Sequence, residues 1–220
     1  MWFLNGTTVA GTASIGNVAT TWAIFSTGDL NADGLGDILW RNTSTGAVAV
    51  WFMNGSQILS TANLGAVSTS WTIVGDDSNG DIFWRDSSGN VAIWKVSGST
   101  ITSAVGLGNV PTNWVIYGIG DFNGDGNADI LWRDGSTGTV AIWFLNASGG
   151  VQSGANVGVV GGTWAIAQAG DYNGDGKSDI LWVDGSGNVA VWFMNGSTIA
   201  STAGYGNVGT SWTVQAQNSE

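Results

Sequence analysis

The chain has 220 residues, of which 16 are acidic and five are basic, giving a formal net charge of −11. It contains no cysteine and no histidine, which excludes disulfides, His-ligated zinc and catalytic triads that need an imidazole base. The basic residues form no patch and there is no long apolar run, which argues against nucleic acid and against membrane insertion. The length suits a single domain, residues 1–220.

The chain opens with two predicted strands, from Trp2 to about Ile15, and four repeats follow at about residues 21–66, 70–110, 113–160 and 163–209. A last predicted strand runs from Trp212 to Gln217. All 14 tryptophans fall into three series with a period of about 48 residues, which indicates tandem structural repeats. The series are Trp22, Trp71, Trp114, Trp164 and Trp212; Trp40, Trp84, Trp132 and Trp182; and Trp2, Trp51, Trp94, Trp143 and Trp192.

Each repeat predicts four short strands and no helix. In the fourth repeat they are residues 164–169, 180–183, 189–194 and 197–202, and Asn195-Gly196 predicts a type I′ hairpin. Side chains on both faces of these strands are apolar, which indicates that each sheet is covered on both sides. The pattern therefore predicts an all-β fold, a β-propeller with blades of four antiparallel strands.

Five blades are expected, and the last is incomplete. Residues 1–20 supply its third and fourth strands and residues 210–220 supply its first, so the N- and C-termini share one sheet and protect its edges. The alternative is an open ring whose ends pair with another copy, giving an oligomer or a filament.

Three acidic loops of the form D-x-N-x-D-G-x-x-D precede the second strand of their repeats, at Asp29–Asp37, Asp121–Asp129 and Asp171–Asp179. Oxygen donors at positions 1, 3, 5, 7 and 9 with a turn glycine at 6 suit Ca²⁺, which takes roughly six to eight oxygens, better than Mg²⁺. The alternative is a set of solvated turns. A fourth loop, Asp76–Asp81, is three residues shorter, and we expect it to bind weakly or not at all.

The combined pattern G-D-x-N-G-D-G-x-x-D-I-L-W-R and V-A-[IV]-W-[FL]-[ML]-N-G resembles the FG-GAP/VCBS repeats of bacterial secreted proteins. Its acidic loop is similar to the calcium-binding blades of integrin α propellers, and five blades of this length resemble the sugar-binding propeller tachylectin. The resemblance implies about three calcium sites. Their ligands would be Asp29, Asn31, Asp33, Leu35 (carbonyl) and Asp37; Asp121, Asn123, Asp125, Asn127 (carbonyl) and Asp129; and Asp171, Asn173, Asp175, Lys177 (carbonyl) and Asp179.

The tryptophans also suggest a lectin-like site, because indole faces stack on sugars and tryptophan is enriched at recognition hot spots. The alternative is that they fill the space between blades. Repeated ligand pockets between adjacent blades would be lined by Trp40 and Arg41, Trp84 and Arg85, Trp132 and Arg133, and Trp182. Val183 replaces the arginine in the fourth repeat, so that copy should be weaker.

Asp86, Asp134 and Asp184 follow the second strand of their repeats and either contact a ligand or cap turns, and we expect no catalytic role for them. The sequence thus predicts a non-catalytic, calcium-stabilised, multivalent binding module for carbohydrate or a cell-surface partner, as in cell adhesion. Weak calcium sites fill outside cells, so we expect a secreted protein whose leader is not part of this sequence. The alternative function is a structural subunit that assembles through the incomplete blade.

Overall fold

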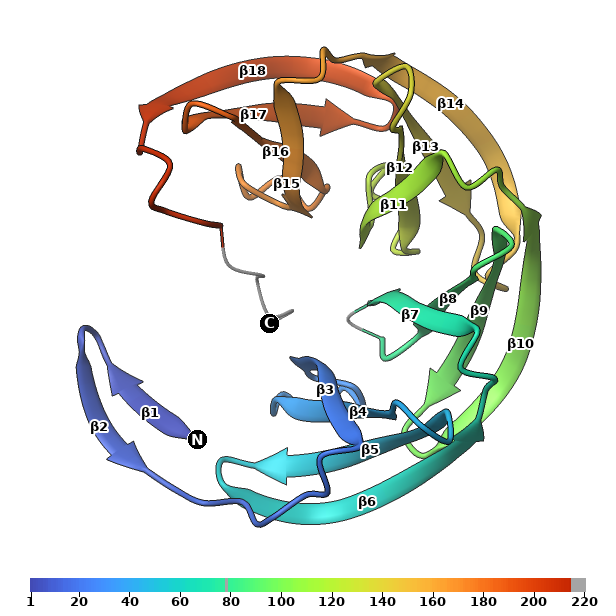
Figure 1. Cartoon of the computed structure of the whole chain (residues 1–220), viewed down its shortest axis with the longest axis vertical. Helices are drawn as coiled ribbons and strands as arrows, with labels where there is room; N and C mark the ends of the chain where they lie inside the picture. Colours follow the sequence, from blue (N-terminus) through green and yellow to red (C-terminus); the bar gives the residue numbers. More distant parts are fainter. Residues whose placement is uncertain (78, 215–220) are drawn as a thin grey trace. The chain divides into compact units, whose positions relative to one another are not determined.

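The structure is a computed structural model that describes residues 1–77 and 79–214. These residues form strands and turns but no helix, so they contain no helical segment able to cross a membrane (Figure 1). The strands are β1 (Trp2–Asn5), β2 (Thr8–Thr12), β3 (Trp22–Gly28), β4 (Asp37–Asn42), β5 (Ala47–Asn54), β6 (Gln57–Ala66), β7 (Trp71–Asp76), β8 (Ile82–Asp86), β9 (Asn90–Ser97), β10 (Thr100–Asn109), β11 (Trp114–Gly120), β12 (Asp129–Asp134), β13 (Thr139–Leu145), β14 (Val151–Val159), β15 (Trp164–Gly170), β16 (Asp179–Asp184), β17 (Asn188–Asn195) and β18 (Thr198–Asn207).

Sheet topology confirms the predicted fold class. Four sheets contain four consecutive strands each, β3–β6, β7–β10, β11–β14 and β15–β18, and neighbouring strands run antiparallel. Such a sheet is the blade of a β-propeller. The protein is therefore an all-β propeller with four complete blades and an incomplete two-stranded sheet, β1–β2, which is consistent with five. Of the expected last strand, Trp212–Val214 are not in a strand, and residues 215–217 lie outside the described residues.

By their internal contacts the residues fall into two compact units. One contains Met1–Ile82 and Trp94–Ala104, and the other contains Phe83–Ile93 and residues 105–214. In the first unit Ile38, Trp40 and Met53 form a buried cluster. In the second unit a larger buried cluster comes from two successive blades. Its members are Phe122, Leu131, Val140, Ile142, Ile166, Ile180, Trp182 and Met194.

The outer strand of blade four is longer than the predicted residues 197–202, because β18 runs from Thr198 to Asn207. The reason lies in the pairing of β17 with β18. Eight residues of β17 pair with β18, and two bulges, at Val189/Ala190 and Phe193/Met194, each add one residue to β18. A bulge places two residues opposite one, so the outer strand needs ten residues to follow eight.

The expected type I′ hairpins are wrong in type. Asn195 pairs with Thr198, so the two central turn residues are Gly196 and Ser197. Gly196 has a φ of 62°, whereas Ser197 is not among the residues with positive φ. A type I′ turn needs positive φ at both central positions, and the observed pattern is that of type II′, with glycine first. Gly6 and Gly55 occupy the same position, each with a φ of 59°.

Blades three and four approach closely within the second unit. A Cβ atom added to Gly118 on β11 would lie 2.6 Å from the Cβ atom of Ala169 on β15. Only glycine permits this approach of the innermost strands. The acidic loops begin directly after these two strands, so their positions follow from the packing of β11 against β15.

Candidate metal centres and the blade junctions

The loop Asp121–Asp129 joins β11 to β12 and winds around the carboxylate of its first residue. Asp121 accepts the backbone N–H groups of Gly124 and Gly126, both at 2.7 Å, and two longer bonds of 3.2 Å from other loop amides. The intact loops of the first and fourth repeats repeat this arrangement, with Asp29 and Asp171 in the same role. The loops are therefore folded around the residue that the sequence places first among the metal ligands.

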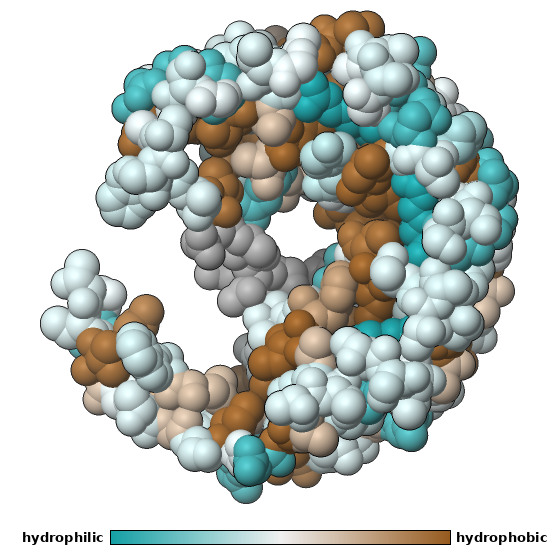
Figure 2. Space-filling view, in the orientation of Figure 1, coloured by the Kyte–Doolittle hydropathy of each residue, from teal (hydrophilic) through white to brown (hydrophobic). Residues whose placement is uncertain are grey.

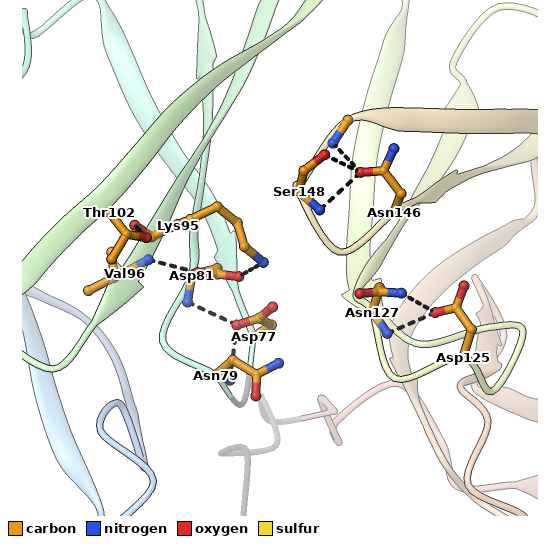
Figure 3. Close-up of polar contacts among 11 residues, drawn as sticks. Asp77, Asn79, Asp81, Lys95, Val96, Thr102, Asp125, Asn127, Asn146 and Ser148 are labelled. Carbon is orange, nitrogen blue, oxygen red and sulfur yellow. Dashed lines mark hydrogen bonds and ion pairs between the residues drawn. The ribbon is translucent and has the colours of Figure 1, made fainter.

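At the loop tip the other two side chains expected to bind the metal, Asn123 and Asp125, are hydrogen-bonded to each other. Asn123 Nδ2 donates to Asp125 Oδ2 at 3.0 Å, and Asn123 Oδ1 accepts the Asp125 backbone N–H at 2.8 Å. Asp125 Oδ1 also accepts the backbone and side-chain N–H groups of Asn127, both at 2.8 Å (Figure 3). A carboxylate has about four lone-pair sites, so these oxygens keep acceptor capacity for a cation.

The first loop retains its shape despite a strained residue. Its fourth position, Ala32, has a φ of 61°, where Gly124 and Gly174 have φ values of 79° in the other loops. Among the described residues Ala32 is the single non-glycine residue with positive φ. A left-handed alanine costs about 1–2 kcal/mol, so the bonds to Asp29 and its neighbours are strong enough to impose the loop conformation.

The ninth residue of each loop is buried and bridges two elements. Asp129, with an exposed fraction of 0%, accepts the backbone N–H of Phe122 through Oδ2 and that of Leu145 through Oδ1, both at 3.0 Å. Asp37 and Asp179 make the same two bonds in their own blades. This carboxylate therefore ties the acidic loop to the end of the third strand.

The donor set fits calcium in chemistry. Each intact loop offers only oxygen donors, which a hard cation prefers. The residues that the structure describes contain no group of three or more carboxylates, histidines or cysteines that would hold a metal by themselves. A cation would thus also need the asparagine and backbone oxygens. The expected carbonyl donors are Leu35, Asn127 and Lys177, whose N–H groups donate to the fifth-position carboxylate.

In the shortened second loop, a lysine side chain pairs with the buried carboxylate. Asp81, the counterpart of Asp129, is 2% exposed, and its Oδ2 forms an ion pair with Lys95 Nζ while Oδ1 accepts the Val96 N–H at 2.8 Å (Figure 3). Sequence reasoning gave Lys95 no role. The signal was present, because the other complete repeats have phenylalanine at this position, as in Trp143-Phe144.

Burial sets the protonation of the ninth-position carboxylates. Desolvation, reinforced by the negative charges of Asp125 and Asp121, raises the pKa of Asp129 to about 6. Desolvation also raises the pKa values of Asp37 and Asp179. In contrast, the backbone N–H of Gly34 lowers the pKa of Asp29 at the first position.

The tryptophan and arginine residues proposed as ligand sites are engaged within the protein. Trp132 and Trp182 are each 2% exposed, and Arg133 is 8% exposed. Arg133 donates to the carbonyl of Trp164 at 2.6 Å and to that of Val160 at 3.1 Å, and its guanidinium carbon lies 5.4 Å from the Trp182 ring centre. It thereby fixes the connection to the next blade.

The same pattern holds at the other positions of this set. Arg41 and Arg85 donate to carbonyls of the following connection, and Trp40 and Trp84 are buried. In blade four, Val183 takes the arginine's place and lines an apolar cavity of about 650 Å³ together with Val208 and Trp212. Within the described residues, the arginine side chains of this set therefore connect one blade to the segment that leads into the next.

The aspartates that follow the second strands cap turns. Asp134 Oδ1 accepts the N–H and the hydroxyl of Ser136, at 2.7 and 2.6 Å. The Ser136 hydroxyl, helped by further hydrogen bonds, lowers the pKa of Asp134 to about 2. Asp86 and Asp184 accept two turn amides each in the same way. They are ionised acceptors and are not poised as general acids.

Two family comparisons agree with this geometry. Residues 121–182 match the FG-GAP-like repeat, and residues 21–51 match the FG-GAP repeat. Each matched range includes an intact acidic loop and the strand that follows it. No curated protein gave a significant match. The two matches and the four-stranded blades together support an FG-GAP β-propeller, a fold that is typically a binding module without catalytic activity.

Proposed function

We propose that this propeller is a calcium-stabilised extracellular binding module that recognises carbohydrate. One observation carries the calcium part: the shortened loop, which lost its metal-ligand pattern, has gained Lys95 beside its buried carboxylate. Within the described residues no lysine or arginine pairs with Asp37, Asp129 or Asp179. A buried charge is costly unless it is compensated. A divalent cation in each intact loop would supply the positive charge that Lys95 supplies in the second.

The carbohydrate part is supported by the tryptophans of the third strands. Three of these tryptophans are only partly buried: Trp51, Trp143 and Trp192. Each packs against a buried tryptophan of the neighbouring strand in a tilted arrangement, with ring centres 4.9–5.1 Å apart. Such pairs hold a rigid, partly exposed indole, which suits stacking on sugar rings. Repetition in several blades would give avidity from weak sites. Asp86, Asp134 and Asp184 accept hydrogen bonds from turn amides, which supports a function without catalysis.

Calcium should stabilise the fold. With a site dissociation constant of ~0.1 mM and ~1 mM calcium, each filled site adds roughly 1.4 kcal/mol, and three sites on the order of 4 kcal/mol. Urea denaturation with calcium and with chelator measures the gain. Asp129→Asn should lose about one third of it, since one site of three is impaired.

Lys95→Met is the matched control for that experiment. Removing Lys95, whose side chain is 25% exposed, leaves the buried carboxylate of Asp81 uncompensated, so the variant should be less stable by about 1–3 kcal/mol. Its calcium gain should equal that of the wild type, because we expect the shortened loop to bind metal weakly or not at all. If the wild type shows the same urea denaturation curve with calcium and with chelator, the calcium proposal is contradicted.

Stability without metal should fall as the pH rises. Asp129 has a folded-state pKa of about 6, above its ordinary value of 3.8, so the folded state holds the proton more tightly than the unfolded state. The unfolding free energy should therefore decrease between about pH 4 and pH 6, by on the order of 3 kcal/mol from this residue. Calcium should restore it increasingly above pH 6. Denaturation curves at pH 4.5 and pH 7 check both trends, and a rise in metal-free stability with pH would oppose them.

Binding to neutral saccharides tests the carbohydrate assignment. The full chain in millimolar calcium should bind part of a glycan array, with calorimetry on the strongest hits giving weak affinity for each site. Chelator should reduce binding only as far as it unfolds the protein. Failure to bind any glycan on the array would refute this part of the proposal and leave the calcium part standing.

Self-assembly is the second candidate function, and the β1–β2 sheet favours it. In this two-stranded sheet the exposed fraction is 75% for Trp2 and 68% for Leu4. Apolar residues are visible on the surface of this sheet in Figure 2. Two strands alone are marginally stable, and unpaired edges invite strand pairing. If another copy completes this sheet, light scattering should give a mass above that of one chain, and Trp2→Ser with Leu4→Ser should lower it. A single-chain mass at all concentrations would exclude assembly.

A further inference from the structure

The third blade contains a cavity that none of the repeated features explains. Its volume is about 450 Å³, and it lies in the second compact unit, over β13, β14 and the connection that precedes β11. This size is within the usual range for small-molecule sites. Its lining includes Asn109, Pro111, Trp114, Trp132, Trp143 and Asn156.

One wall is open because of a single glycine. Gly154 on β14 pairs with Trp143, whereas the corresponding partners of Trp51 and Trp192 are Thr61 and Thr202. A Cβ atom on Gly154 would lie 3.0 Å from Cδ1 and 3.3 Å from Nε1 of Trp143. The absent side chain therefore leaves this indole edge uncovered, and Gly154 itself lines the cavity.

Arg85 holds the lining residues Val110, Pro111 and Trp114 through their backbone carbonyls. Its guanidinium donates to the carbonyl of Trp114, to Val110 at 3.1 Å and to Pro111 at 3.0 Å, and it lies 5.2 Å from the ring centre of Trp132. Pro111 is the single proline of the chain, and its ring fixes φ. A pre-formed site avoids the ordering cost of binding. The charge of Arg85 is already met by carbonyl oxygens.

The lining chemistry selects the ligand class. Three indoles provide apolar faces, Asn109 and Asn156 provide neutral polar groups, and no charged side chain lines the cavity. Trp132 Nε1 is buried and has no hydrogen-bond acceptor within the described residues. Trp40 and Trp182 share that feature, but in blade three the indole borders a cavity. A buried donor without a partner calls for an acceptor such as a hydroxyl oxygen.

We infer that this cavity is a binding site for one neutral saccharide ring, with its C–H face on the indoles and its hydroxyl groups on the asparagine amides. The inference rests on the proposed carbohydrate function and narrows it to blade three. The other blades would then serve the fold or bind more weakly.

The test replaces Gly154 with the residue that its neighbours use. Gly154→Thr should fold, because threonine stands opposite the equivalent tryptophan in two other blades, and it should weaken binding of neutral methyl glycosides at least tenfold by calorimetry. Gly204→Thr is the matched control, since a Cβ atom there meets nothing within 4 Å. It should bind like the wild type. N-acetylneuraminic acid serves as the charged comparison and should bind more weakly than the best neutral glycoside.

The outcomes separate the site from the function. If the wild type binds no saccharide, the carbohydrate function and this site both fail. If the wild type binds and Gly154→Thr binds equally well, the site is wrong and the function stands. Stronger binding of the charged sugar overturns the neutral class. Should Gly154→Thr not fold, Asn156→Ala removes an exposed amide and should weaken binding several-fold, and unchanged affinity overturns the site.

Discussion

The buried carboxylate that ends each acidic loop is the contact on which the blades depend. In blade three, Asp129 at the start of β12 accepts one amide from the start of its loop and one from the end of β13, so a single side chain joins the loop to two strands of the blade. Apart from its buried second residue, Phe122, the loop has little apolar surface to bury. Hydrogen bonds to carboxylates replace that driving force, and charged acceptors are stronger than neutral ones.

This construction creates a problem of charge that the protein meets in two ways. Nine of its 16 acidic residues lie in the three intact loops, and each loop buries one of them. In the shortened loop Lys95 reaches the buried Asp81 and satisfies it from within. The intact loops keep phenylalanine at that position and concentrate oxygen donors instead. Under the proposed function, calcium would affect stability through the electrostatics of this one buried position.

Repetition supplies the scaffold, and departures from it supply the candidates for specific function. Arg85 and Arg133 hold successive blade connections. Each donates to an equivalent valine carbonyl, of Val110 or Val160, and lies over the tryptophan of the next blade. Where the arginine becomes Val183, an apolar cavity follows. Where threonine becomes Gly154, an indole edge is exposed in a cavity with neutral polar groups. In each place a residue that departs from the repeat lines the cavity.

The sequence by itself determined the repeat, the four-stranded blades and the acidic loops, because tryptophan spacing, short apolar runs and glycine-rich turns are local signals. Only the tertiary structure decided the rest. It showed the two-amide role of Asp129, the Lys95–Asp81 pair and the cavity opened by Gly154, since each depends on residues 11 or more positions apart that meet through strand register. Turn type also escaped prediction, because pairing of Asn195 with Thr198 moved the turn by one residue.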